Sequence, residues 1–542
     1  MQAAQLTGVD VLTRGEVLES ALQARDYLVT NGVPAGLAAK DPRLWGRRAV
    51  DHSRLGWLDL PRTSHELLSQ IGGLVSEIRY SGLDNVVLIA MGAEALAAQT
   101  IVEDVGGGAA LTIVDGTPPL TGVLDPARLD RTFVIMSSKR GAALETEACR
   151  RILEQALRDH GMSEPEIAHR FLVITDHGSP LDAFARERGY RLGLTDPYLP
   201  GHYGALSAYG VVPAVLAGAE VGPLLDEAAG VLPYLAKEEA NPGLLLGAIL
   251  GGCALGGPNG VPRDKVVIHT SSRPLSAWLR QLVAAATGKR GRGILPLDDT
   301  GWRLPDPGHD VHGIALNPRS PATAGADTSV FGPLGAQFLL WDYAAAAAAW
   351  LIGVNPFDGP EEYVTEVEND AAGMLSTGPP LPSGEPTFVD DMIEVYVDPA
   401  IGHFGGPNLR DVIEGIVRSV PVNGYLSVVS YLSGHQVLAE GFTQQLAERI
   451  RRPVSFEWGP SALQGTASYH KDGPRTGVFL IVTADADADE DTPVPDQSYT
   501  LGALRLARAL ADVRALRRRR LPVVWLHLRD AAAGTARLTE AV

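Results

Sequence analysis

Short apolar runs alternate with helically spaced stretches from about residue 85 onward. Val86–Ile89, Leu111–Val114, Phe133–Met136 and Phe171–Ile174 have the length of buried strands. Between them, apolar residues recur at the spacing of amphipathic helices. Strands that alternate with helices predict a parallel sheet covered by helices. The pattern therefore predicts an α/β fold.

The chain before this region has a helical pattern. A turn at Leu60–Ser64 supplies an N-cap for a predicted helix over His65–Arg79. We expect residues 1–70 to form an N-terminal helical segment.

Two further α/β units are predicted beyond residue 235. The second has a strand at Lys265–His269, a helix at Leu275–Ala286 and an Ala-rich helix at Trp341–Trp350. The Pro- and Gly-rich segment Thr377–Pro386 is typical of a linker. We expect the three units to span residues 71–235, 236–376 and 387–542. Predicted strands of the last unit are Met392–Val397, Tyr425–Val429, Val454–Trp458, Val478–Val482 and Val523–Leu528.

Composition indicates a globular protein with several cores, since 45% of the 542 residues are hydrophobic. The longest apolar run, Leu244–Gly257, is interrupted by glycine and is shorter than the roughly 20 residues of a membrane span. We therefore expect no membrane span. The net charge of −18 argues against a nucleic-acid partner.

Only two cysteines occur, Cys149 and Cys253. They provide neither a disulfide framework nor a thiolate metal site, and the N-terminus shows no secretory signal. We expect a cytoplasmic protein without a metal or another cofactor.

Two charged segments allow simple interpretations. Arg517–Arg520 closes a predicted helix, where it forms a solvated C-terminal cap or contacts a partner. Asp485–Asp491 alternates carboxylates but lacks the glycine and the final glutamate of a calcium loop. We interpret it as a solvated acidic loop.

An anion site is predicted after the strand Phe133–Met136. The chain continues through Ser137, Ser138 and Lys139 into a glycine and then a helix. Free N–H groups and the helix dipole favour negative charge at such a turn. Hydroxyls normally complete the site, but their positions hold Arg140, Ala142 and Ala143.

The order of several motifs resembles the glucose-6-phosphate isomerase family, in particular the actinobacterial and transaldolase-fused branch of its double sugar-isomerase (SIS) fold. The resemblance implies two SIS domains, a homodimer, and proton transfer between C1 and C2 of a hexose phosphate through an enediol. That chemistry needs a phosphate clamp, a carboxylate base and cations. The motifs are AAKDPRLW (38–45), RLGWLDLPRTS (54–64), VVLIAMGAEALA (86–97), SSKRGAALET (137–146), ITDHGSPL (174–181), GHYGALSAYGVVPA (201–214), ATGKRGRGILP (286–296), PLGAQFLLWDYA (333–344), GVNPFDGP (353–360) and YHKDGPRTGVFL (469–480).

The implied phosphate clamp is altered in both loops. Gly92-Ala93-Glu94-Ala95 stands where the family has a Gly-Gly-Ser turn, so that a carboxylate replaces hydroxyls. One hypothesis is that Glu94 occupies the anion position and pairs with Arg140. The alternative is that both side chains are exposed and unrelated.

The implied base and cations are also replaced. Ala285 stands where the family has its glutamate base, and His202 where it has an arginine. The register of a family lysine falls on Glu366. Pro333 occupies the neighbourhood of the ring-opening histidine, just before the retained Gln337.

Several polar residues match the family. Glu145 serves either the site or the first turn of its helix. His470 and Lys471 face the cleft or solvent. The substrate-binding candidates are Gly92, Glu94, Ser137, Ser138, Lys139, Arg140, Thr146, Lys289, Gln337, His470 and Lys471.

Two functions follow from these replacements. The first is an isomerase relative without normal activity, which binds a sugar-like or sugar-phosphate-like metabolite or a protein partner. The second is an active enzyme on a different sugar-like substrate, with or without phosphate, in which His202 is the acid/base and Glu145 or Glu94 the carboxylate. Ordinary isomerase activity would require a base from elsewhere in the fold.

Overall fold

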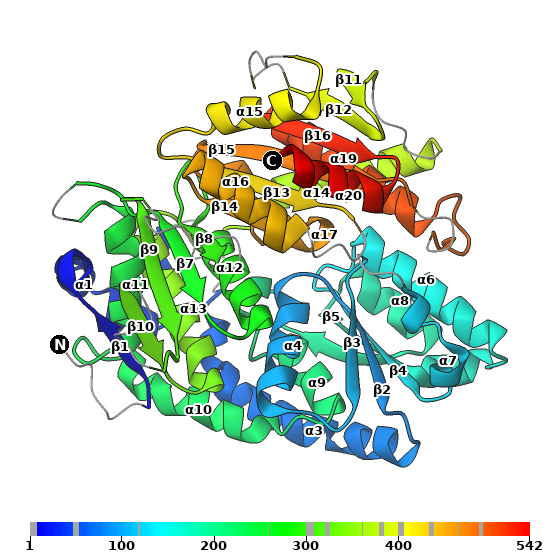
Figure 1. Cartoon of the computed structure of the whole chain (residues 1–542). Coiled ribbons are helices and arrows are strands. Elements are labelled where there is room, and N and C mark those ends of the chain that lie inside the picture. The colour runs from blue at the N-terminus through cyan, green and yellow to red at the C-terminus, as the bar shows by residue number, and fades with distance from the viewer. Residues whose placement is uncertain are drawn as a thin grey trace.

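Three sheets, each covered by helices, make up the described part of the chain (Figure 1). The fold class predicted from sequence is confirmed, because the sheets are mainly parallel and flanked by helices. The computed structural model describes residues 8–46, 54–116, 120–257, 260–299, 308–319, 326–359, 361–378, 384–398, 401, 406–432, 438–463, 465–486 and 491–542.

The first sheet is parallel throughout, with strand order β3-β2-β4-β5-β6. Every residue of β2, β4 and β5 is buried, which explains their unbroken apolar runs. The strands are β2 (Asn85–Ile89), β3 (Ala110–Val114), β4 (Thr132–Ser137), β5 (Phe171–Asp176) and β6 (Arg191–Thr195), and the helices around them are α3 (Leu60–Tyr80), α4 (Ala93–Val105), α5 (Pro126–Leu129), α6 (Leu144–Asp159), α7 (Glu164–Arg170), α8 (Pro180–Arg188) and α9 (Ala208–Leu216).

The second sheet has strand order β1-β10-β9-β7-β8, and only β1 runs antiparallel. Its strands are β1 (Asp10–Thr13), β7 (Lys265–His269), β8 (Leu295–Asp298), β9 (Val311–Leu316) and β10 (Thr328–Phe331), and the associated helices are α1 (Gly15–Thr30), α2 (Val33–Ala38), α10 (Val221–Leu235), α11 (Pro242–Ala254), α12 (Arg273–Thr287) and α13 (Leu334–Leu351).

Small residues let α11 and α13 pack closely. A Cβ atom at Gly247 would lie 2.9 Å from the Ala344 carbonyl oxygen, and Gly243 and Gly251 face α13 in the same way. The glycines that interrupt the longest apolar run therefore serve helix packing. No helix among the described residues is long and apolar enough to cross a membrane.

The third sheet has strand order β11-β12-β16-β15-β13-β14, with β11 and β12 antiparallel to their neighbours. It lies across the other two sheets, in yellow to red in Figure 1. Its strands are β11 (Phe388–Asp390), β12 (Ile393–Val397), β13 (Tyr425–Ser430), β14 (Val454–Trp458), β15 (Gly477–Ala484) and β16 (Val523–Leu528), and its helices are α15 (Leu409–Ser419), α16 (Thr443–Ile450), α17 (Gly459–Ala462), α18 (Ala467–Asp472), α19 (Leu501–Arg518) and α20 (Ala531–Ala541).

Helix α14 (Glu361–Ser376) packs against α19 and neutralises much of the basic run that closes α19. Arg518 pairs with Glu366 at 2.6 Å and with Asp370 at 2.8 Å, and Arg519 pairs with Glu366 at 2.9 Å. The run is therefore more than a solvated cap, because two of its arginines pair with carboxylates of a neighbouring helix of the same chain.

Two local predictions are wrong. The N-terminal segment is not wholly helical, because Asp10–Thr13 pairs with Thr328–Phe331, more than 300 residues away. Helix α3 begins at Leu60 with Pro61 in its first turn, where a missing N–H costs nothing. Ser64 is therefore inside the helix, and its hydroxyl donates to the Leu206 carbonyl.

Two predicted segments are only partly covered by the structure. Residues 379–383 of the predicted linker and residues 487–490 of the predicted acidic loop lie outside the described residues.

Candidate functional site

Two adjoining cavities lie beyond the carboxyl ends of the first sheet's strands. The larger, about 210 Å³, is lined by loops that follow β2, β4, β5 and β6 and by residues near 201 and 357. The smaller, about 60 Å³, lies over the loop after β4. The chain changes direction across the sheet between β2 and β4, which is where open α/β sheets bind ligands.

The loop after β4 has the form predicted for an anion-binding turn, but one of its N–H donors already has an acceptor within the loop. Gly141 has a φ of 65°, and a Cβ there would lie 2.6 Å from the Leu181 Cβ, so only glycine fits. The Gly141 N–H donates to the Ser138 hydroxyl at 3.2 Å. One donor of the cradle is thus used within the loop.

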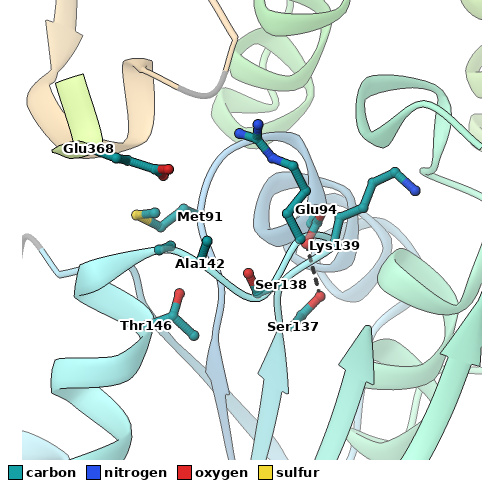
Figure 2. Close-up of a pocket in the computed structure, with 10 residues that line it drawn as sticks. Met91, Glu94, Ser137, Ser138, Lys139, Ala142, Thr146 and Glu368 are labelled. Carbon is teal, nitrogen blue, oxygen red and sulfur yellow. Dashed lines mark hydrogen bonds between the residues drawn. The ribbon is translucent and has the colours of Figure 1, made fainter. Parts of the chain in front are cut away.

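Glu94 lies in the first turn of α4, after Gly92 at a φ of 67°. Its carboxylate accepts a hydrogen bond from the Ser137 hydroxyl at 3.1 Å (Figure 2). Burial raises the pKa of Glu94 to about 7, and the Ser137 hydrogen bond and the charge of Lys139 only partly oppose this effect. A carboxyl group of this chain thus faces the loop where the resemblance implies phosphate.

Lys139 is fully engaged by neighbouring oxygens. Its ammonium donates to both carboxylate oxygens of Asp176, at 2.9 and 2.7 Å, and to the carbonyls of Asp196 and Pro197, both at 3.2 Å. Asp176 also accepts from the Tyr209 hydroxyl at 3.0 Å. Sequence reasoning missed Asp176, although a polar residue at the carboxyl end of a buried strand is a usable signal.

Arg140 is exposed and lines both cavities. It forms no ion pair with Glu94 or with another described residue. The hypothesis of a Glu94–Arg140 ion pair is therefore wrong. Glu94 accepts from Ser137 instead, and Arg140 acts on it only through its charge, which lowers the pKa of Glu94. The alternative that both are exposed is wrong for Glu94, whose pKa burial raises.

His202 lines the larger cavity from a short 3-10 turn, Gly201–Tyr203. Its Nε2 lies 3.3 Å from the Pro356 carbonyl and donates to it in the neutral ring. Burial and the charges of Lys289 and Arg54 lower the pKa of His202 to about 3. The imidazole therefore offers the cavity no positive charge at neutral pH.

Lys289 and Gln337 hydrogen-bond within the protein. The Lys289 ammonium donates to the Asp358 carbonyl at 2.6 Å, and burial lowers its pKa to about 8. Gln337 is buried in α13, where its side-chain oxygen accepts from Trp341 at 3.1 Å. Ala285 is buried in α12. Neither Lys289 nor Gln337 is among the residues that line the two cavities.

Glu145 lies in the first turn of α6, where both its oxygens accept from Arg508 of α19 at 2.7 Å. Burial raises the pKa of Glu145, but the charge and hydrogen bonds of Arg508 outweigh it and leave the pKa below its usual range. Its neighbour Thr146 lines the smaller cavity. Glu145 therefore ties the first sheet to the third section instead of facing a ligand.

His470 and Lys471 face neither the cleft nor solvent, so both predicted alternatives are wrong. His470 is buried in α18 between the Tyr425 hydroxyl at 2.7 Å and Glu457 at 3.0 Å. The Lys471 ammonium pairs with Asp512 at 2.6 Å. Both belong to the core of the third section.

Known proteins match parts of this chain, although no protein-family model matches it. The glucose-6-phosphate isomerase of Rubrobacter xylanophilus is 28% identical over 261 residues, which cover 44% of this chain and 58% of the relative. A probable glucose-6-phosphate isomerase of Natronomonas pharaonis is 28% identical over 221 residues, which cover 40% and 50%. The resemblance to glucose-6-phosphate isomerases is confirmed. The chain spans about half the length of the curated relatives it matches.

Solved structures show the shared fold. A hypothetical protein from Thermus thermophilus matches with a TM-score of 0.53 and 21% identity, covering 66% of this chain and 98% of that one. A glucose-6-phosphate isomerase from Chlamydia trachomatis matches with a TM-score of 0.51 and 16% identity, covering 69% and 89%. The glucose-6-phosphate isomerase-like fold therefore extends over about two thirds of the chain.

The titration of Glu94 predicts a pH-dependent difference in stability between this protein and a Glu94→Gln variant. Its pKa is raised from 4.5 to about 7, so the folded protein retains a proton that the unfolded chain loses, and stability falls as pH rises through this interval. Glu94→Gln removes the titration and keeps an acceptor for Ser137. We expect it to stabilise the protein by up to about 3 kcal/mol at pH 8 and hardly at all at pH 4.

Unfolding midpoints of both proteins from pH 4 to pH 8 check this result. Glu19→Gln, at an exposed position on α1, serves as the control. A difference between Glu94→Gln and the parent that stays constant across this range would contradict the raised pKa.

Proposed function

We propose that this glucose-6-phosphate isomerase-like protein does not interconvert glucose 6-phosphate and fructose 6-phosphate. In this proposal it binds a small carbohydrate-like molecule without phosphate in the two cavities, as a metabolite- or partner-binding protein. The observation that carries the proposal is the hydrogen bond from Ser137 to Glu94, at the loop where the resemblance implies phosphate.

The electrostatics of the loop support this proposal. A phosphate dianion needs free donors and positive charge, but Lys139 is engaged by Asp176 and two carbonyls. A dianion would also lie beside Glu94, and the ionised form of that carboxyl group would repel it. Ala285, at the position implied for the base, cannot accept a proton.

A direct assay tests the proposal. Purified protein is incubated with glucose 6-phosphate or with fructose 6-phosphate, and the other sugar phosphate is measured by coupled enzymes. We expect no turnover above the background without protein. Turnover near the roughly 10 per second typical of enzymes would refute the proposal.

A second candidate, catalysis on a different sugar-like substrate, is favoured by one observation. Glu94 and His202 line the same cavity, and Glu94 has a pKa near neutrality, as proton transfer at neutral pH requires. Glu145 is excluded as the carboxylate of this second candidate, because both its oxygens accept hydrogen bonds from Arg508. If an activity on an unphosphorylated sugar is found, Glu94→Gln should abolish it, and full retention would exclude Glu94 as the proton carrier.

A further inference from the structure

We propose that the smaller cavity binds the ammonium group of an amino sugar that lacks phosphate, between Glu94 and Glu368. This inference rests on the proposed function and specifies its ligand class. The larger cavity holds the sugar ring, and the smaller one holds the amino substituent. The two cavities adjoin, because Met91, Glu94, Lys139 and Arg140 line both.

The unpaired charges around the smaller cavity favour a cation. Glu94 and Glu368 both line it, and neither forms an ion pair with a described residue. Lys139 is paired with Asp176, whereas the charge of the exposed Arg140 lowers the pKa of both carboxyl groups without an ion pair to either. The two carboxylates, when ionised, carry one negative charge more than Arg140 neutralises. A ligand with one positive charge would balance that excess, whereas a phosphate dianion would add to it.

Glu368 approaches the site from a different part of the chain. It extends from α14 toward the loop after β4, on the side opposite Ser137 (Figure 2). Burial raises the pKa of Glu368, and the charges of Arg508 and Arg140 oppose this effect. A half-buried carboxyl group next to an open cavity gains from a ligand that donates hydrogen bonds to it.

Thr146 is a second and independent sign of a polar ligand. Only 5% of the residue is exposed, and its hydroxyl makes no hydrogen bond to another described residue. Figure 2 shows the hydroxyl directed into the space below Met91 and Glu368. Solvent in the cavity reaches this hydroxyl, so its oxygen is able to accept a hydrogen bond from a ligand N–H group.

The size of the cavity and its donor set select an ammonium group over a metal ion. About 60 Å³ accommodates an amino group with its carbon, since a single water needs roughly 10–15 Å³ by the same measure. Among the described residues, no group of three or more His, Cys, Asp or Glu side chains is placed to hold a metal ion. Two carboxylates and a hydroxyl match the three donors of an ammonium group.

A series of sugars tests the inference on the unmodified protein. Calorimetric titration at pH 7 compares glucosamine, glucose, N-acetylglucosamine, glucosamine 6-phosphate and glucose 6-phosphate. We expect glucosamine to bind about tenfold more tightly than glucose or more, because its hydrogen bonds to the carboxylates are charge-assisted. N-acetylglucosamine, which lacks the charge, and both phosphates should bind more weakly than glucosamine.

Variants test whether the preference for glucosamine over glucose arises in the smaller cavity. Glu368→Gln should weaken glucosamine binding by about tenfold while glucose binding stays the same, because Glu368 lines only the smaller cavity. Glu94→Gln should also weaken glucosamine binding by about tenfold. Glu103→Gln, at the other end of α4 and outside both cavities, should change neither.

The outcomes separate this inference from the proposed function. Equal binding of glucose and glucosamine, or no binding of any sugar, would overturn the ammonium site and leave the isomerase assay as a separate test. Tighter binding of glucose 6-phosphate than of glucose would contradict both the ammonium site and the proposed loss of phosphate binding.

Discussion

Replacing Arg508 by methionine is expected to lower the free energy of unfolding by about 3 to 5 kcal/mol. Glu145 and Arg508 are 1% and 2% exposed, and their two hydrogen bonds are both 2.7 Å long. Without the guanidinium, the Glu145 carboxylate would stay buried and unpaired, or would have to take up a proton. Either outcome destabilises the folded protein.

Denaturant unfolding followed by tryptophan fluorescence measures this loss. The double variant Glu145→Gln/Arg508→Met removes both charges and should recover most of the stability. Arg62→Met, which breaks the exposed Arg62–Glu66 pair, should change stability by less than about 1 kcal/mol. If the double variant were as unstable as Arg508→Met alone, the loss would come from packing and not from the unpaired carboxylate.

The second large effect is expected at Asp310, which connects the second sheet to the third section. Its carboxylate accepts from Arg452 at 3.0 Å and pairs with the fully buried Lys265 at 2.8 Å. Asp310→Ala would remove the carboxylate that both cations share. Lys265 would keep its pair with Asp264 at 2.7 Å, and Arg452 would keep its hydrogen bonds to the Gly424 carbonyl. We expect a loss of about 3 kcal/mol, the lower end for breaking a buried ion pair, because each buried cation would lose one of its partners and keep the other.

The same unfolding measurement checks this variant. Asp26→Ala, which removes an exposed carboxylate paired with Arg25, is the matched control and should have little effect. Adding Arg452→Met to Asp310→Ala should restore part of the loss. A cost as small as that of Asp26→Ala would mean that water or other groups solvate Lys265 and Arg452.

The parallel strands were predictable because their residues are buried on both faces. The predicted Val86–Ile89 and Val454–Trp458 lie within one residue of β2 and β14. Strand β1 was not predictable, since four residues gain their order only by pairing with a strand more than 300 residues away. The unit boundaries at residues 70, 235 and 376 stay predictions.

The location of the candidate site was predictable from the sequence, but the pairing of its side chains was not. The turn after Phe133–Met136 identified the loop, and its missing hydroxyls indicated altered anion binding. The sequence could not show that Lys139 meets Asp176 or that Glu145 meets Arg508, 363 residues further along the chain. Such contacts depend on tertiary packing, which local patterns do not encode.

The position of Glu145 restrains the loop after β4. Helix α6 begins directly after that loop, and Glu145 anchors its first turn to α19. On the other side, Gly141 packs against Leu181 with no room for a Cβ. A shift of this loop would therefore strain the buried Glu145–Arg508 pair or the Gly141–Leu181 contact, which couples ligand binding at the loop to α19.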